Sequence, residues 1–317
     1  MTTFKATTPA AYWKIIKHLQ VQSVTTSRAG DMKEDLGITV ISDNPRTRWI
    51  MRDDKFNMAF ALQESFAYWK GLNPGDVERY NTNMETWLND DGKLPGSAYG
   101  DRMRNTIGHD QIERVIEQLE DNPQTRRAVI SIHQPSNEDY FGEDVACSMY
   151  LQPFIRDDKL HMIGDIRSQD MYWGYVYDTQ NNQYIQEVLA GYFDLEVGNY
   201  YHKMNSCHYY TEFESKVKRS LDVATAEVGP DLRLPRYDHG IVMSLLSDGL
   251  DSAKNGKCPG DEIHTIASYN QGYADWLTLM TAYEFERYQD KSDIAKYIAN
   301  DIEHYPWKEW MLKYIKR

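Results

Sequence analysis

The sequence predicts an α/β core followed by a helical appendage. Stretches that alternate apolar and polar residues, as strands do, are interleaved with stretches whose apolar residues recur every three or four positions, as in helices. After about Asp238 only helical patterns occur. We therefore expect one large α/β core over residues 1–238 and a helical extension over residues 239–317 packed on it.

Helical periodicity and end signals define five helices of the core. The second ends at Gly71 and the third stops at Asn122-Pro123. Thr25–Asp35 is predicted to be a loop, and Asn73–Lys93 to be turns with a short helical piece at Met84–Leu88. The predicted helices are Pro9–Gln22, Phe56–Lys70, Gln111–Glu120, Asp170–Tyr192 and Thr211–Leu221.

Strands are predicted where β-branched and aromatic residues cluster between turn signals. Lys159–Ile166 is expected to pair with the run that Cys147 opens, because Asp157-Asp158 suits a hairpin turn. The other predicted strands are Ile38–Ile41, Thr47–Met51, Ala128–His133, Leu195–Val197 and Tyr200–Asn205. The helices expected after the core are His239–Ala253, Ile263–Arg287, Ser292–His304 and Pro306–Ile315, with a linker at Lys254–Asp261.

Charge and composition narrow the classes of function. The 317 residues carry a net charge of −13, which argues against binding polymeric nucleic acid but leaves an anionic small substrate open. The three cysteines (147, 207, 258) form neither a disulfide framework nor a Cys-x-x-Cys metal clip, which favours a reducing cytoplasm and no metal. No apolar run approaches the ~18 residues of a membrane span.

The hairpin around Cys147 places a thiol at the start of one strand and Arg167-Ser168 at the end of its neighbour. A thiolate beside guanidinium groups has a lowered pKa and becomes a nucleophile. From the thiol alone, a small buried hydrophobic residue is the more common outcome.

The order and spacing of seven motifs resemble the thymidylate synthase family, over about two thirds of the chain. The resemblance implies a mixed sheet with surrounding helices, and a homodimer that uses 5,10-methylenetetrahydrofolate. The motifs are Ser27-Arg28-Ala29-Gly30; Glu64 before Gly71; Leu94 to Gly100, with Tyr99; Asn122 to Arg127; Cys147 with Gln152; Arg167-Ser168-Gln169-Asp170 with Gly174; and His208 with Tyr210.

One departure points to a branch of that family. Asp178 stands where thymidylate synthases carry the Asn that reads uracil, so the chain resembles the phage-type deoxycytidylate hydroxymethylases. An ionised Asp offers acceptors only, which suits the exocyclic amine of cytosine. Read by itself, Asp178 is also a common kind of helix cap.

The resemblance implies a role for each matching residue. Cys147 adds to C6 of the pyrimidine, Glu64 organises proton transfer, and Tyr99 aids deprotonation at C5. Glu64 lies among apolar neighbours, so burial should raise its pKa, although a structural salt bridge would also explain it. Two further departures are Ala146 and Ser148 in place of the Pro and His that flank the nucleophile, and Ser206 in place of an Asp.

The remaining assignments concern binding. Arg28 and Arg167 with Ser168 are expected to hold the phosphate, joined by Arg126 and Arg127 from the partner of a homodimer. By itself, the Arg126-Arg127 pair reads equally well as a solvated start of a strand. His208 and Tyr210 match the pair that bonds the sugar 3′-hydroxyl; Gln152, Asp170 and Gly174 complete the nucleotide site. Trp87, Trp173 and Asp170 are candidates for the folate, although both Trp residues also suit an ordinary core.

The expected reaction is conversion of dCMP to 5-hydroxymethyl-dCMP. A methyl product, a CMP substrate, a catalytically inactive nucleotide-binding regulator and a purely structural helical protein are the alternatives. Retention of both Cys147 and Glu64 argues against an inactive protein.

Overall fold

The computed structural model describes residues 2–51, 56–134, 144–223 and 227–315, which form two compact units. The first contains Met1–Leu189 and Leu195–Val228, and the second contains Ala190–Asp194 and Gly229–Arg317. The division expected at residue 238 stays a prediction about domains.

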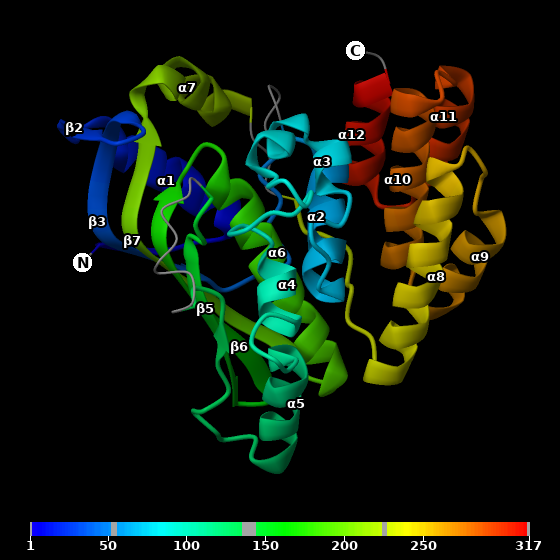
Figure 1. The fold of residues 1–317 in the computed structure, drawn as a ribbon, viewed down its shortest axis with the longest axis horizontal. Coiled ribbons are helices and arrows are strands. Elements are labelled where there is room, and N and C mark those ends of the chain that lie inside the picture. The colour runs from blue at the N-terminus through cyan, green and yellow to red at the C-terminus, as the bar shows by residue number, and fades with distance from the viewer. Residues whose placement is uncertain (1, 52–55, 135–143, 224–226, 316–317) are drawn as a thin grey trace. The chain divides into compact units, whose positions relative to one another are not determined.

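A mixed sheet forms the centre of the first unit (Figure 1). Within the described residues it has seven strands in the order β1-β3-β7-β6-β5-β4, with β2 paired to β3. The pairs β1/β3 and β6/β7 are parallel, and the other pairs are antiparallel. The strands are β1 (Thr2–Lys5), β2 (Val24–Ser27), β3 (Gly30–Ser42), β4 (Ile130–Ser131), β5 (Ser148–Arg156), β6 (Lys159–Asp170) and β7 (Glu196–Tyr210).

The predicted mixed α/β architecture is confirmed. Asp157 and Asp158 form the turn between β5 and β6, both with positive φ, as a tight hairpin turn of that type requires. The loop expected at Thr25–Asp35 is instead the β2/β3 hairpin, with Arg28 at its turn. Ala128–His133 is reduced to the two residues of β4, and the two strands expected between 195 and 205 are parts of β7.

The strand predicted at Thr47–Met51 is wrong. This segment is irregular, yet Thr47 to Ile50 are all buried. The buried Arg48 side chain is bonded to Gln180 and Glu187, two residues of a helix that is described below. An apolar run in a sequence shows burial and does not reveal which partner satisfies the buried polar groups.

Helix α6 (Gly174–Tyr192) connects the parallel strands β6 and β7. It packs against α1 and β7, since Tyr175 stacks on Tyr12 and contacts His202 edge-on. On another side α2 bonds to it through Ser65 and Asn181. From Thr179 to Glu187 every residue of α6 is therefore buried, including a run of five polar ones.

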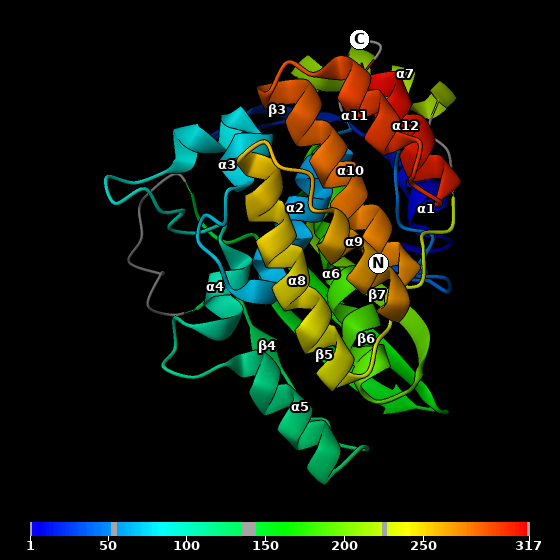
Figure 2. The same cartoon turned by 90° about the vertical axis from the view of Figure 1, so that its right-hand side faces the viewer.

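The other helices of the first unit lie around this arrangement (Figures 1 and 2). Asn57 caps α2 by accepting from the Phe60 amide, and Gly71 ends it in the left-handed conformation. The helices are α1 (Thr8–Gln20), α2 (Met58–Lys70), α3 (Val77–Tyr80), η1 (Thr82–Trp87), α4 (Tyr99–Arg104), α5 (Gln111–Asp121), η3 (Thr211–Phe213) and α7 (Glu214–Val223).

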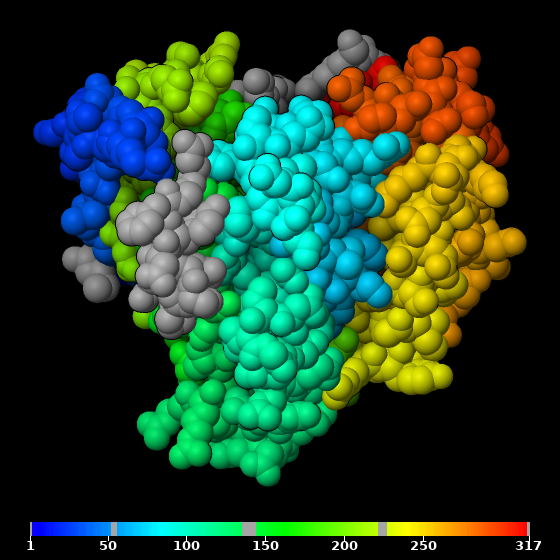
Figure 3. All heavy atoms as spheres, viewed as in Figure 1, coloured from blue at the N-terminus to red at the C-terminus, as the bar shows by residue number. Residues whose placement is uncertain are grey.

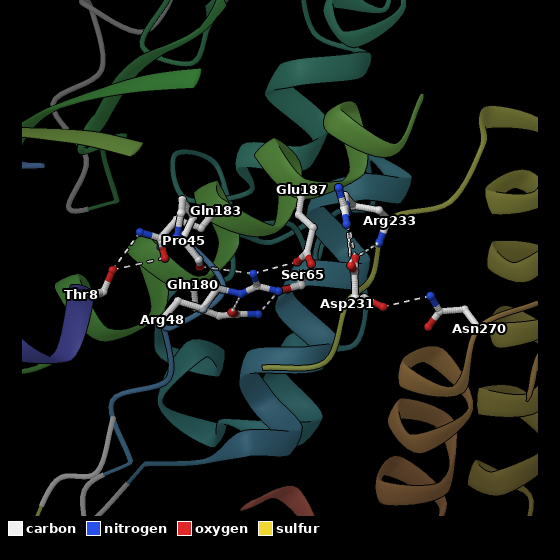
Figure 4. Close-up of polar contacts among 10 residues, drawn as sticks. All are labelled: Thr8, Pro45, Arg48, Ser65, Gln180, Gln183, Glu187, Asp231, Arg233 and Asn270. Carbon is white, nitrogen blue, oxygen red and sulfur yellow. Dashed lines mark hydrogen bonds and ion pairs between the residues drawn. The ribbon is translucent and has the colours of Figure 1, made fainter. Parts of the chain in front are cut away.

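The second unit is helical, as predicted for the C-terminal residues. Its central helix α10 is buried from Gly272 to Phe285. The helix expected over Ile263–Arg287 is broken at Asn270, which caps α10 and bonds to the carbonyl of Asp231, itself paired with Arg233 (Figure 4). The helices are α8 (Arg236–Lys254), α9 (Gly260–Tyr269), α10 (Gln271–Tyr288), α11 (Ser292–Ala299) and α12 (Tyr305–Ile315).

Candidate active site

Cys147 lies immediately before β5 and is half-buried. Its carbonyl accepts a hydrogen bond of 2.9 Å from the Arg167 amide of β6. Asp144, which lies before Val145 and Ala146, accepts bonds from the amides of Gly96 at 2.8 Å and Ser97 at 3.0 Å. The segment that carries the thiol is thus fixed on both sides.

Gly96 is required by a close approach of two backbones. A Cβ on this residue would lie 2.1 Å from the carbonyl oxygen of Asp144. Gly100 meets a similar limit, since its Cβ would lie 2.5 Å from the carbonyl oxygen of Ala67 in α2. Both glycines of the Leu94–Gly100 motif therefore let this loop pack under the thiol and against α2.

The Arg167 guanidinium supports the backbone beside the thiol, donating to the carbonyls of Ala146 at 2.9 Å and Val145 at 3.0 Å. The predicted lowering of the thiol's pKa is wrong for this chain. Burial raises the pKa of Cys147 to about 11; Arg167 opposes that rise, whereas the nearby carboxylates of Asp178, Asp144 and Asp170 add to it.

Tyr99 begins α4 and directs its phenol at the same segment. Its oxygen accepts from the amides of Cys147 at 3.0 Å and Ser148 at 3.4 Å. Burial raises its pKa well above the ordinary value, and the neighbouring Cys147 and Asp178 reinforce this. Tyr99 therefore remains a neutral phenol whose proton is free of the two bonds that its oxygen accepts.

Glu64 lies in α2 and accepts a 2.6 Å bond from the side-chain amide of Asn181 in α6. Burial, followed by repulsion from Asp178, raises its pKa to about 8, and the Asn181 bond opposes the rise. The rise expected from the sequence is confirmed. A carboxyl group with such a pKa can give or accept a proton near neutral pH.

The orientation of Asn181 is fixed from the interior of the first unit. Arg48 pairs with Glu187 at 2.8 Å and donates to Gln180 at 2.6 Å (Figure 4). Gln180 donates to the Ser65 hydroxyl at 2.9 Å. That hydroxyl donates to the Asn181 side-chain carbonyl at 2.6 Å, which leaves the Asn181 NH₂ directed at Glu64.

Asp178 lies one turn before Asn181 and near Glu64. Its Oδ2 accepts a 2.8 Å bond from the side-chain amide of Gln169. Burial raises the pKa of Asp178 to about 6; the Gln169 bond opposes this, and Asp170 adds to it. A Cβ on Gly174 would lie 2.7 Å from Gln169 Nε2 and 3.2 Å from Asp178 Oδ2, so the absence of a side chain there makes room for the pair.

His208 and Tyr210 lie at the end of β7, with ring centroids 5.2 Å apart. His208 Nδ1 lies 3.3 Å from the Ser206 hydroxyl, which donates a short bond to Glu34. Burial lowers the pKa of His208, while Asp170 and Glu34 oppose that shift. Glu34 therefore supplies, through Ser206, the carboxylate that the Ser replacement had removed.

The other predicted residues fall into two groups. Near the thiol, Ser168 pairs in register with Ser206, Asp170 caps the turn after β6 through the amides of Tyr172 and Trp173, and Arg28 lies near Tyr210. Arg126 and Arg127 are exposed after α5, and Gln152 donates to the Arg126 carbonyl. The segment that contains α5 is the green surface at the bottom of the view in Figure 3. Trp87 is 40% exposed on η1, and Trp173 is half-buried against Phe213.

The sequence interpretation missed Asn181, Gln169 as a partner of Asp178, and Glu34. For Asn181, the available sequence signal was the polar run Thr179–Gln183 inside a helix that connects two central strands. The described residues contain neither a group of three or more His, Cys, Asp or Glu placed to hold a metal nor a helix long and apolar enough to cross a membrane.

Comparison with known proteins identifies the family of the chain. A family profile described as "Thymidylate synthase" matches residues 47–245, and the chain belongs to that family of one-carbon transferases, which bind a nucleotide and methylenetetrahydrofolate. The chain is 26% identical to "Deoxyuridylate hydroxymethyltransferase" of Bacillus phage SP01, over 96% of this chain and 82% of that protein. It is 27% identical to "Thymidylate synthase" of Bacillus mojavensis, over 62% of this chain and 78% of that protein.

Proposed function

We propose that the protein converts dCMP and 5,10-methylenetetrahydrofolate to 5-hydroxymethyl-dCMP and tetrahydrofolate. The observation that carries this proposal is Asp178, a half-buried carboxylate near Cys147 and Glu64, with one oxygen bonded to Gln169. An ionised carboxylate accepts from the amino group of cytosine. The 4-oxo group of uracil would instead face a second acceptor, at a cost of about 1–3 kcal/mol.

Cys147 is the proposed nucleophile. Its thiolate adds to C6 of the pyrimidine, which turns C5 into an enamine-like nucleophile. Bound methylenetetrahydrofolate supplies the one-carbon unit. The proton at C5 then leaves and the bond between the new methylene carbon and the folate nitrogen breaks, which releases tetrahydrofolate; Tyr99 and the proton-exchanging Glu64 are the proposed groups for the proton. Water adds to the resulting exocyclic methylene of the nucleotide, and expulsion of the thiolate from C6 completes the hydroxymethyl product.

The binding residues are proposed by position. Arg28, Arg167 and Ser168 hold the phosphate together with Arg126 and Arg127 of a second subunit, whose exposure in one chain supports this arrangement. His208 and Tyr210 bond the sugar, and the Glu34–Ser206 pair fixes the His208 ring. Asp170 and Gly174 shape the base site, and Gln152 holds the backbone at Arg126. The exposed ring of Trp87 and the half-buried ring of Trp173 are the proposed stacking partners of the flat pterin.

Sequence similarity supports water as the nucleophile that completes the product, because the phage relative that matches 96% of this chain is named a hydroxymethyltransferase. The same relative is named for deoxyuridylate, which makes dUMP hydroxymethylation the second candidate. A protonated Asp178 could donate to the 4-oxo group, and its pKa of about 6 makes that form accessible below neutral pH.

The folate product distinguishes the reactions. Incubation with dCMP and methylenetetrahydrofolate should yield tetrahydrofolate, because water and not hydride completes the product; dihydrofolate would show methyl transfer. The Cys147→Ala variant should release no tritium from C5-labelled dCMP. Parallel reactions with CMP and dUMP give the preferred nucleotide, and turnover of none of them would contradict an enzymatic role.

A further inference from the structure

A chain of four buried side chains ends on Asp178. Asn182 Nδ2 lies 3.0 Å from Tyr200 Oη, which lies 2.8 Å from His202 Nδ1. His202 Nε2 lies 2.7 Å from Gln169 Oε1, and Gln169 Nε2 lies 2.8 Å from Asp178 Oδ2. Each of the four supporting residues is at most 1% exposed, so these bonds form without competition from solvent.

The hydrogen bonds from Asn182 to Asp178 all run in one direction, from donor to acceptor. Burial lowers the pKa of His202 to about 3, so the ring is neutral and has one donor and one acceptor nitrogen. The Asn182 amide can only donate to Tyr200. The Tyr200 hydroxyl then donates to Nδ1, which puts the ring proton on Nε2, facing the Gln169 carbonyl oxygen.

The bond from Gln169 to Asp178 determines which form of the carboxyl group is favoured. With its carbonyl oxygen held by His202, the Gln169 side chain presents its NH₂ to Asp178. A donor at this oxygen favours the carboxylate over the protonated acid, and it leaves Oδ1 to meet a ligand. A reversed amide would set an oxygen against Asp178 and favour a proton on it.

We infer that Asn182, Tyr200, His202 and Gln169 form a positioning relay that keeps Asp178 an acceptor and thereby sets selection of a 4-amino over a 4-oxo pyrimidine. This inference rests on the proposed function, because it assigns the origin of base preference at the same site. None of the four residues is a catalytic residue, since they act through Asp178.

Other groups near Asp178 act in the opposite sense. Asp170 raises its pKa, and Asp178 interacts with Glu64 and Tyr68 from α2, Tyr99 from α4, Cys147 before β5 and Tyr200 from β7. None of these groups supplies a positive charge. The Gln169 NH₂ is therefore the group whose loss should move the titration of Asp178 upward.

The test uses the full-length Gln169→Met variant, which keeps the side-chain length and removes both bonds. The ratio of kcat/KM for dCMP over dUMP should fall about tenfold or more. The acidic limb of the dCMP profile should move to higher pH, and dCMP binding measured by calorimetry should show the same movement. Gln183→Met is the matched control: Gln183 is a buried glutamine of α6 that bonds to Thr8 (Figure 4), and its loss should leave the ratio and the profile unchanged.

Tyr200→Phe tests the far end of the relay without touching Asp178. It should shift ratio and profile in the same direction, and the double variant with Gln169→Met should be no worse than Gln169→Met alone. Wild-type ratio and pH profile in both single variants would overturn the relay. A wild-type enzyme that prefers dUMP would overturn the proposed function instead, and the pH profile of the variants would still decide the relay.

Discussion

At the scale of single residues, the site holds two carboxyl groups and a thiol whose protonation is set mainly by burial. Glu64 and Asp178 have pKa values raised to about 8 and about 6, and Cys147 to about 11. The thiol is therefore not activated in advance in this chain. We infer that the bound nucleotide, with the arginines of the proposed second subunit, completes its activation.

Alkylation tests the state of the thiol. Without nucleotide, Cys147 should react slowly with iodoacetamide at neutral pH, and its rate should keep rising above pH 9 because burial disfavours the thiolate. Peptide mass spectrometry follows each cysteine separately, with the exposed Cys258 as the internal reference. Rapid modification of Cys147 that levels off near pH 7 would contradict the raised pKa.

Glu64 makes stability depend on pH. Its folded pKa of about 8 exceeds the ordinary 4.5, so the folded state holds the extra proton between these values and loses stability as pH rises through them. Glu64→Gln should flatten this part of the stability curve, by at most about 1.4 kcal/mol per pH unit. Urea unfolding from pH 5 to pH 9 measures the effect; parallel curves for both proteins would show that Glu64 does not titrate there.

At the scale of elements, α6 matters most because it carries both Asp178 and Asn181 while it is buried on several sides. Its position depends on the irregular segment at Arg48, whose ion pair with Glu187 is fully buried. The pair connects that segment to α6 and, through Gln180 and Ser65, to the amide that bonds Glu64.

Removing one member of this pair should therefore be costly. Arg48→Met leaves a buried carboxylate without its partner and should reduce the free energy of unfolding by about 3–5 kcal/mol. The double variant Arg48→Met/Glu187→Leu should lose less, since neither charge remains. Denaturant unfolding of the two variants compares them, and a double variant less stable than the single one would contradict the argument.

Local patterns predicted elements whose signals are contained in neighbouring residues. The Asp157-Asp158 turn, the end of α2 at Gly71, and α5 are of this kind. The irregular path at Thr47–Met51 was not predictable, because its partner Glu187 is about 140 positions away along the chain. For the same reason the motifs indicated Asp178 and Glu64 but not Asn181 or the Gln169 amide that orients the carboxylate.

At the scale of the whole molecule, the proposed function requires that a second subunit complete the site. Arg126 and Arg127 are exposed, and the Arg126 carbonyl accepts from Gln152, which lies farther along β5 than the thiol. Among the predicted arginines, a single chain therefore offers the phosphate only Arg28 and Arg167. A homodimer in which this pair enters the partner's site would supply the remaining charge.

Mixing inactive variants tests this arrangement. Cys147→Ala keeps the arginines, and Arg126→Ala/Arg127→Ala keeps the nucleophile. After unfolding and refolding of an equal mixture, heterodimers should hold one intact site each, which restores about a quarter of wild-type activity. Each variant refolded alone is the control, and a mixture no more active than the controls would contradict sharing of sites.

The base preference is the centre of the account, and one comparison tests it most directly. The ratio of kcat/KM for dCMP over dUMP is measured for the wild type and for Asp178→Asn, with methylenetetrahydrofolate in both cases. We predict that the wild type prefers dCMP and that Asp178→Asn shifts the preference toward dUMP by about tenfold or more, since an amide can donate to the 4-oxo group. A wild type that turns over dUMP readily and leaves dCMP unchanged would contradict it.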